Sequence, residues 1–218
     1  MKMNLLMLAL AAFAPVAFAE VQLYDTGPSE ETSYVRFVNA TDHAISVVSA
    51  KGSIELSDKA AARSSKFFPV KSGVKLSATI QSGAQKVGSE VTGKPWEYIT
   101  IAILPKGGKQ MTTRLVRETP DDFNAMRASL SLVNLDARCS AAMMQGGAKS
   151  ATILDQVHPL SAQRRLINPV KLLASVSCDA ETAKLPVDLG QLQAGKRYSV
   201  FLMTVNKSRQ AFFVRDGN

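Results

Sequence analysis

The segment "SYVRFVNATDHA" at residues 33–44 and the segment "ASLSLVNLDARC" at residues 128–139 begin in the same way. Each alternates apolar and polar residues with a period of two, as a half-buried β-strand does, and each then reaches Val-Asn. An Asn suits the exit of a strand, because its side chain can bond to nearby backbone and the residue tolerates a left-handed conformation. We therefore interpret Asn39 and Asn134 as structural residues that end the first long strand of two related units.

The similarity between the two halves extends beyond these openings. Further pairs of segments follow one another in the same order: "GVKLSATIQS" (73–82) with "PVKLLASVSC" (169–178), "KPWEYITIAI" (94–103) with "GKRYSVFLMT" (195–204), and "LVRE" (115–118) with "FVRD" (213–216). The middle pair aligns Tyr98 with Tyr198, and we interpret Gly93 and Gly195 as members of one repeated turn. Several matches in one order indicate a duplicated unit of about 95–100 residues.

The repeated unit has the pattern of a β-sandwich. Its apolar and polar residues alternate with a period of two, and Gly and Pro fall between the runs, where turns need special backbone angles. Short strands with a turn about every 8–12 residues are typical of sandwiches and barrels. We therefore predict an all-β chain with two tandem, duplicated β-sandwich domains at residues 20–117 and 125–218, joined by a linker at 118–124.

Residues 1–19 have the features of a secretory signal peptide. A basic residue precedes an apolar run, and the run ends in the A-x-A motif Ala17-Phe18-Ala19. We predict cleavage between Ala19 and Glu20 and export of the mature chain. The alternative is an uncleaved membrane anchor, but the run is shorter than the roughly 20 apolar residues of a membrane-spanning helix.

Charge is distributed unevenly along the chain. Residues 20–124 hold 13 basic and 12 acidic residues, whereas residues 125–218 hold 12 and 6, so their net charges are +1 and +6. A basic exported half suits an acidic partner such as a polyanionic glycan, a membrane surface or an acidic protein, with charge that only maintains solubility as the alternative, and no nucleic acid is predicted as a partner. Within it, "SAQRRLINPVK" contains Arg164, Arg165 and Lys171. We predict a loop whose three cations bind an acidic partner, with an ordinary solvated loop as the alternative.

The chain has two cysteines, Cys139 and Cys178, and both fall in the second repeat. Two cysteines in an exported protein are expected to form a disulfide, which contributes about 4 kcal/mol for a loop of this length in the chain-entropy model. A reactive thiol would need a base, and the two histidines, His43 and His158, stand in no motif with either cysteine. The spacing of His and Cys matches no metal-site signature, so we predict neither a bound metal nor a cofactor.

Other motifs for catalysis or binding are weak. "GSEVTGKP" at residues 88–95 resembles a phosphate-binding loop, but it ends in Pro95 and runs into a predicted strand rather than a helix. The sequence contains no G-x-S-x-G nucleophile motif. Trp96 could stack on a sugar, yet its place just before a repeated strand favours packing.

The start of the mature chain is similar to that of a known family. In "LYDTGPSEETSYVRFVNA" at residues 23–40, the Leu-Tyr, Gly-Pro and Val-Arg pairs and the final Asn stand where the alginate biosynthesis protein AlgF family has them. "INPVKL" (167–172) and "QAGKRYSVFLM" (193–203) fit the second half of that family. One departure is Asp25-Thr26, which separates the Tyr from a Gly-Pro that is expected sooner. These motifs are strand and turn residues, which specify fold more than chemistry.

The resemblance implies a periplasmic protein that is required for O-acetylation of alginate, a polymer of uronic acids. It implies partners among the other acetylation proteins, which are a membrane-bound O-acyltransferase and lipase-like periplasmic transferases, with the alginate polymer as a further candidate. The family has no recognised catalytic motif, so the resemblance provides no catalytic residue and implies a non-catalytic adaptor or relay. Two alternatives stay open, a carbohydrate-binding module for the polymer and an acyltransferase with an unrecognised nucleophile.

Overall fold

The computed structural model describes residues 31–50, 52–108, 110–119, 124–147, 149–179 and 183–217. The predicted signal peptide and its cleavage site between Ala19 and Glu20 lie outside the described residues. Within the described ranges, no helix is long and apolar enough to cross a membrane. The one helical element in these ranges is a short 3-10 helix, η1, at Ala60–Arg63.

Each half of the chain forms eight strands. Those of the first half are β1 (Thr32–Asn39), β2 (Ile45–Ser49), β3 (Gly52–Leu56), β4 (Phe68–Lys71), β5 (Lys75–Ser82), β6 (Gln85–Thr92), β7 (Tyr98–Gly107) and β8 (Gln110–Glu118). Those of the second half are β9 (Ala128–Asn134), β10 (Ala142–Gly146), β11 (Ala151–Val157), β12 (Ser161–Ile167), β13 (Lys171–Cys178), β14 (Leu185–Gln191), β15 (Arg197–Val205) and β16 (Ser208–Asp216). Their β-branched and aromatic residues suit a pleated sheet with one face in a core.

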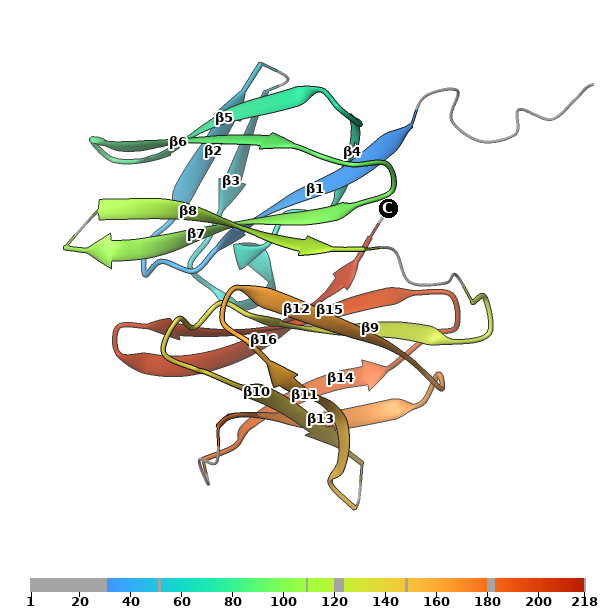
Figure 1. The fold of residues 1–218 in the computed structure, drawn as a ribbon. Coiled ribbons are helices and arrows are strands. Elements are labelled where there is room, and N and C mark those ends of the chain that lie inside the picture. The colour runs from blue at the N-terminus through green and yellow to red at the C-terminus, as the bar shows by residue number, and fades with distance from the viewer. Residues whose placement is uncertain are drawn as a thin grey trace, which may run out of the picture.

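Each half is a sandwich of two four-stranded sheets (Figure 1). The strand orders are β4-β1-β7-β8 and β3-β2-β5-β6 in the first half, and β12-β9-β15-β16 and β11-β10-β13-β14 in the second. The second pair of orders is the first with each strand replaced by the one eight places later. The parallel pairing of β1 with β7 also recurs between β9 and β15. The predicted fold of two duplicated β-sandwiches is therefore confirmed, whereas the domain limits at 20–117, 118–124 and 125–218 stay predictions.

Asn39 and Asn134 have the same role at the ends of β1 and β9. The side-chain amide of Asn39 donates to the backbone oxygen of His43 (2.8 Å), and that of Asn134 donates to the backbone oxygen of Cys139 (2.9 Å). Each side-chain oxygen accepts the backbone N–H of the residue two positions later. Both side chains are buried, so the prediction that these residues are structural is confirmed.

The strand register corrects one part of the predicted alignment. Counted from the repeated Asn, Tyr34 corresponds to Ser129, and their parallel partners are Tyr98 and Arg197. The structural counterpart of Tyr98 is therefore Arg197 rather than Tyr198. Because side chains alternate between the two faces of a strand, this shift of one residue places the tyrosines on different faces. Tyr198 lies in the core of its sandwich, whereas Tyr98 stacks on Tyr34 with ring centroids 4.8 Å apart.

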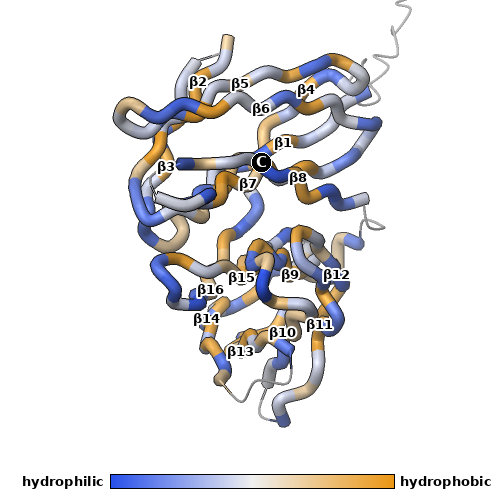
Figure 2. Tube along the Cα trace, turned by 60° about the vertical axis from the view of Figure 1, so that its left-hand side comes forward, coloured by the Kyte–Doolittle hydropathy of each residue, from blue (hydrophilic) through white to orange (hydrophobic). Residues whose placement is uncertain are grey.

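The two sandwiches are stacked, which gives the molecule four sheet layers (Figure 1). One hydrophobic cluster fills each sandwich, and a third cluster lies between sheet β4-β1-β7-β8 and sheet β12-β9-β15-β16. The third cluster includes Val38 and Ala102 from the first half and Val133 and Phe201 from the second. Figure 2 shows apolar stretches of β9 and β15 in the middle of the molecule. Since both faces of β9 are covered, the strand is buried along its whole length.

Candidate interaction sites

Arg36 links the two sandwiches through a side chain that is almost fully buried. It extends from β1 and donates from Nη1 to Asp216 Oδ1 (2.7 Å) and from Nη2 to Ser199 Oγ (3.0 Å), both in the second sandwich. Its guanidinium lies 4.2 Å from the ring centroid of Phe67 and 4.7 Å from that of Phe201. Burial lowers the pKa of Arg36, and the negative charge of Asp216 opposes that effect. In a separate sandwich the side chain of Arg36 would be exposed to water. Here it instead connects the first sandwich to the second.

Arg164 completes this charged cluster from the second sandwich. It lies on β12 and donates from Nε to Glu118 Oε1 (3.1 Å), at the end of β8, and from Nη2 to Asp216 Oδ2 (3.2 Å). Two arginines and two carboxylates therefore meet at the junction, and their side chains are at most 5% exposed. A buried ion pair adds little net stability, but leaving one of its charges unpaired is strongly unfavourable. The cluster therefore favours a single docking geometry of the two sandwiches.

The structure separates the three cations that the sequence predicts to lie in one loop. The predicted loop is largely strand β12, and Arg164 is engaged in the junction. Arg165 lies on the opposite face, because successive strand residues alternate, and it donates to the backbone oxygen of Ile153 (3.2 Å). Lys171 is exposed at the start of β13, in the other sheet. The loop is thus corrected to a strand, whereas binding of an acidic partner by Arg165 and Lys171 stays a prediction.

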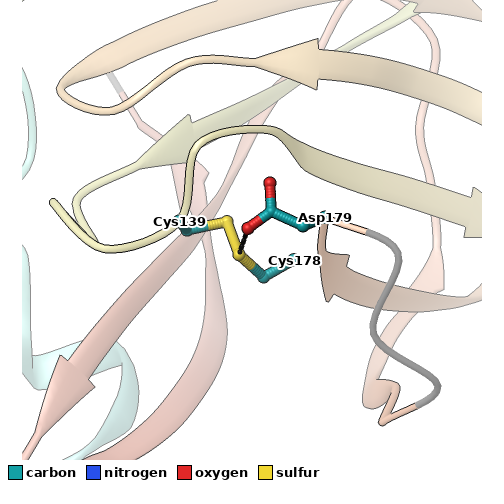
Figure 3. A group of neighbouring side chains, drawn as sticks. All are labelled: Cys139, Cys178 and Asp179. Atoms are coloured by element: carbon teal, nitrogen blue, oxygen red, sulfur yellow. Dashed lines mark hydrogen bonds between the residues drawn. A yellow bond between two sulfur atoms is a disulfide. The ribbon is translucent and has the colours of Figure 1, made fainter.

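Cys139 and Cys178 are joined by a disulfide, with their Cα atoms 5.5 Å apart (Figure 3). The predicted bridge is therefore confirmed. It ties the loop after β9 to the end of β13. At the corresponding corner of the first sandwich, Ser82 Oγ donates to the backbone oxygen of Ala44 (3.1 Å). The same corner is tied covalently in one half and by a hydrogen bond in the other.

Asp179 lies against this disulfide, with its Oδ2 3.1 Å from Cys178 Sγ (Figure 3). Its Oδ1 accepts hydrogen bonds from Ser140 Oγ and from the backbone N–H of Ala141, and the bond from Ser140 lowers the pKa of Asp179. The two sulfurs and this carboxylate form a group compact enough for a metal ion. Metal ions bind the thiolate form of cysteine, which a bridged sulfur cannot adopt. We interpret Asp179 as a residue that braces the disulfide corner.

The contacts of the two histidines are to a carboxylate and to a backbone oxygen, and not to a hydroxyl or a thiol. His43 Nδ1 lies 2.8 Å from Asp42 Oδ1, and that hydrogen bond lowers the pKa of Asp42. His158 Nδ1 lies 3.1 Å from the backbone oxygen of Ser140. A Ser or Cys nucleophile is activated when its own hydroxyl or thiol bonds to a base. These two contacts therefore hold loops together and do not activate a nucleophile.

A cleft of about 530 Å³ lies where η1 of the first sandwich approaches β14 and β16 of the second. The residues that give it chemical character are Ser65, Lys66, Val187, Asp188, Phe213 and Arg215. Clefts between domains are frequent ligand sites, and two cations against one carboxylate leave this one with a small positive charge beside apolar walls. No sequence pattern marks this cleft, because its walls come together only when the sandwiches dock.

Exposed apolar side chains gather at the end of the molecule where β1 and β9 begin, which we name the open end. Five of the six well-exposed large apolar residues of the described ranges belong to it: Val74, Trp96, Met126, Val170 and Leu173, at 46–76% exposure. The guanidinium of Arg197, at the start of β15, lies 4.2 Å from the ring centroid of Tyr98, at the start of β7. The corresponding ends of the two sandwiches therefore lie on the same side of the molecule. Exposed apolar side chains at one end of a molecule suit contact with another macromolecule.

Trp96 is the residue of the open end that sequence reasoning assigns to packing, whereas the structure leaves it 47% exposed. Its structural counterpart is Gly195, because the Trp96 N–H donates to the backbone oxygen of Thr32 (2.7 Å) and the Gly195 N–H donates to that of Arg127 (2.8 Å). The predicted alignment of Gly93 with Gly195 is therefore corrected. The sequence alone does not pair Trp96 with Gly195, because that pairing follows only from the register of the strands.

Comparison with known proteins identifies a family. Residues 5–199 match the family model described as alginate O-acetyl transferase AlgF. No curated protein matches the chain. Similar solved structures include proposed cell adhesion proteins from Bacteroides ovatus ATCC 8483 (10% identity, 86% of this chain and 97% of that chain, TM-score 0.27) and Bacteroides uniformis ATCC 8492 (9%, 87% and 98%, TM-score 0.29). TM-scores this low carry no argument about function.

Proposed function

Because this chain belongs to the alginate O-acetyl transferase AlgF family, it has a role in the O-acetylation of alginate, and we propose that it acts there as a non-catalytic adaptor in the periplasm. The adaptor brings acetylation proteins into contact with one another. Its candidate partners are the membrane-bound O-acyltransferase and the lipase-like periplasmic transferases of that system. The adaptor itself needs no cofactor and carries no catalytic residue.

The observation that carries this proposal is the open end. Single exposed apolar residues are ordinary, but a group that spans two sandwiches at one end is typical of a surface that contacts another macromolecule. Exposed lysines, including Lys94 and Lys171, lie at the same end and attract acidic surfaces. A protein that assembles others needs such a surface, whereas an enzyme needs a site with a nucleophile or a base.

The buried junction supports the same function. Partners held by an adaptor keep a fixed relation only if the adaptor itself is rigid. Arg36 and Arg164, paired with Asp216 and Glu118, together with the apolar cluster around Phe201, connect the sandwiches over a wide area. The two halves therefore present their outer surfaces as one body, and a partner on one sandwich has a defined position relative to the other.

The interdomain cleft favours a second candidate function, binding of the alginate polymer. Lys66 and Arg215 on its rim suit uronate carboxylates, and Phe213 provides an apolar wall for a sugar ring. Binding of this kind weakens as salt rises, because exposed charges are screened. An adaptor that also holds the polymer would bring substrate and transferases together.

The decisive experiment is capture of partners from envelope extracts of alginate-producing cells, with the full-length tagged protein as bait. Acetylation proteins should be enriched, and purified alginate should be tested separately at low and high salt. Failure of the folded protein to capture any acetylation protein would contradict the adaptor function. An acetyl group on the intact protein, detected by mass spectrometry, would instead support the acyltransferase alternative.

Export can be tested on the same material. The protein from the periplasmic fraction should begin at Glu20, because cleavage is predicted after Ala19. A protein that keeps Met1 and stays in the membrane fraction would contradict both the cleavage and the periplasmic location.

A further inference from the structure

Trp96 has a backbone conformation that bulky residues rarely adopt. It lies in the turn between β6 and β7, and its φ is 64°. In this left-handed region a β-carbon crowds the next carbonyl oxygen, which destabilises the turn relative to one with Gly. The second sandwich has Gly195 at the same position, with φ 70°. The first sandwich therefore keeps a Trp where the fold itself favours Gly.

Packing does not account for this Trp. Nearly half of the side chain, 47%, is exposed, so the ring contributes less buried apolar area than a core Trp would. Residues in unfavourable backbone conformations are concentrated at functional sites, where the surrounding structure holds them in place. The combination of a left-handed backbone and an exposed indole points to a function outside the fold.

The backbone of the turn that carries Trp96 is held in place by its neighbours. Glu97 Oε2 accepts from the backbone N–H of Lys94 (2.9 Å) and from Arg117 Nη1 (2.7 Å), so one buried carboxylate holds both the turn and β8. The turn also sits tightly on β1, because a β-carbon on Gly93 would lie 2.2 Å from Ser33 Oγ. A turn that is already ordered loses little backbone freedom on binding, which favours affinity.

The neighbours of Trp96 indicate what it contacts. Val74, 50% exposed, belongs to the adjoining turn, which is linked to this one by the hydrogen bond from Gly73 N–H to Gly93 O (2.9 Å). Lys94 is exposed two residues before the indole. We infer that Trp96 anchors a protein–protein contact, in which the indole enters an apolar pocket of an acetylation protein and carboxylates on the pocket rim face Lys94. This inference rests on the proposed adaptor function and specifies the chemistry of the partner surface.

A protein pocket fits these neighbours better than a sugar ring does. A stacked sugar also needs polar side chains that bond to its hydroxyl groups. Glu97 and Arg117, the charged side chains that hold the turn, are bonded to each other and to backbone, and Val74 is apolar, so Lys94 is the one of these neighbours that is left to bond to a sugar. An exposed Trp beside an aliphatic side chain and a basic residue is typical of the anchor of a protein interface.

The test uses the full-length exported protein with Trp96→Gly, which introduces the residue that the second sandwich has. The thermal unfolding midpoint should fall by no more than a few degrees, because relief of the left-handed backbone offsets part of the apolar area that the half-buried ring loses. Capture of acetylation proteins should fall by about tenfold or more, as expected for a central aromatic anchor. Val48→Ala is the matched control, since Val48 is exposed on β2 and outside the open end, and it should change neither quantity.

A second measurement requires no substitution. Trp96 is the only Trp of the chain, so labelling with fluorotryptophan gives a single fluorine NMR signal. That signal should shift when a captured acetylation protein is added, and it should stay unchanged when alginate is added.

The outcomes separate the inference from the function on which it rests. Normal capture by a stable Trp96→Gly protein would overturn the inference and leave the adaptor function standing. A large fall in the unfolding midpoint of that variant, together with an unshifted fluorine signal, would make Trp96 a packing residue and overturn the inference. Loss of alginate retention with normal protein capture would assign Trp96 to sugar stacking and overturn it as well. Capture of no acetylation protein by the unaltered chain would overturn both.

Discussion

The two sandwiches share a strand order, a parallel central pairing and a buried Asn at the exit of the first strand, yet they differ at their corners and turns. The second has a disulfide between Cys139 and Cys178 where the first has a hydrogen bond from Ser82. The first has Trp96 where the second has Gly195. Core positions must fill the same space in both halves, so they retain their character. Residues in the corners and turns of the sandwiches are not constrained by core packing, and the differences between the halves there indicate function.

The largest effect should come from separating the sandwiches at their junction. Asp216→Ala removes the carboxylate that pairs with both Arg36 and Arg164, which leaves two buried cations short of a partner. We expect a loss of about 3–5 kcal/mol in the free energy of unfolding. Chemical denaturation of the purified protein measures this loss.

Arg165→Ala is the matched control for that experiment, because Arg165 neighbours Arg164 in sequence but is exposed on the opposite face. Its loss should change the free energy of unfolding by no more than about 0.5 kcal/mol. Equal effects of Asp216→Ala and Arg165→Ala would contradict the role of the charged cluster in docking.

The next largest effect should come from the disulfide. Replacing Cys139 and Cys178 by Ser should destabilise the second sandwich by about 2–4 kcal/mol, because the unfolded chain is then less constrained. Hydrogen exchange should show the loss of protection in β9 to β16 and little change in β2, β3, β5 and β6.

Ser82→Ala tests the equivalent corner of the first sandwich. It removes only the hydrogen bond to Ala44, so a cost of about 1 kcal/mol is expected there. A larger cost for Ser82→Ala than for loss of the disulfide would show that the two corners are not equivalent.

Acid should lower the stability of the second sandwich through Asp136. The counterpart of Asp136 in the first sandwich is Thr41, which carries no carboxyl group. Burial raises the pKa of Asp136, but hydrogen bonds from Thr204 Oγ1 (2.6 Å), the Arg138 backbone N–H and Arg209 Nε (3.0 Å) outweigh that effect, so its pKa lies below the ordinary value. A carboxyl with a lowered pKa in the folded state contributes stability above its unfolded pKa of about 4. That stability is lost as the pH falls through the lower, folded pKa.

We expect Asp136 to contribute about 1–3 kcal/mol at neutral pH, as hydrogen bonds to a charged group do. Asp136→Asn should therefore weaken the protein at pH 7 and flatten the dependence of its stability on pH below about 4. Denaturation of both proteins from pH 7 to pH 3 measures this difference. An unchanged slope in the variant would exclude Asp136 as the acid-sensitive group.

The smallest effect should come from the turn before β15. Gly195→Ala adds a β-carbon at φ 70°, which should cost about 1 kcal/mol, whereas Trp96→Gly in the equivalent turn removes such a β-carbon together with the ring. Thermal unfolding of the two single variants compares them directly. Stabilisation by Gly195→Ala would mean that the two turns do not share a conformation.

The sequence alone determined the features that depend on local pattern. Alternation with a period of two and the repeated Val-Asn predicted two β-sandwiches, and the structure has them. Two cysteines in an exported chain predicted the bridge between Cys139 and Cys178. Similarity could not set the register to the residue, so Tyr98 was aligned with Tyr198 when its counterpart is Arg197. One residue decides which face a side chain occupies, and a weak repeat does not fix it.

Only the tertiary structure decided what covers the outer faces of the sheets. Arg36 and Arg164 occupy polar positions of alternating strands, which by pattern should face water, yet both are buried where the sandwiches dock. Trp96 shows the reverse, since an aromatic residue beside a core strand is exposed in a left-handed turn. The physical reason is that alternation records which residues share a face, whereas the residues that meet that face come from 46 to 180 positions away along the chain, as the hydrogen bonds of Arg164 and Arg36 do.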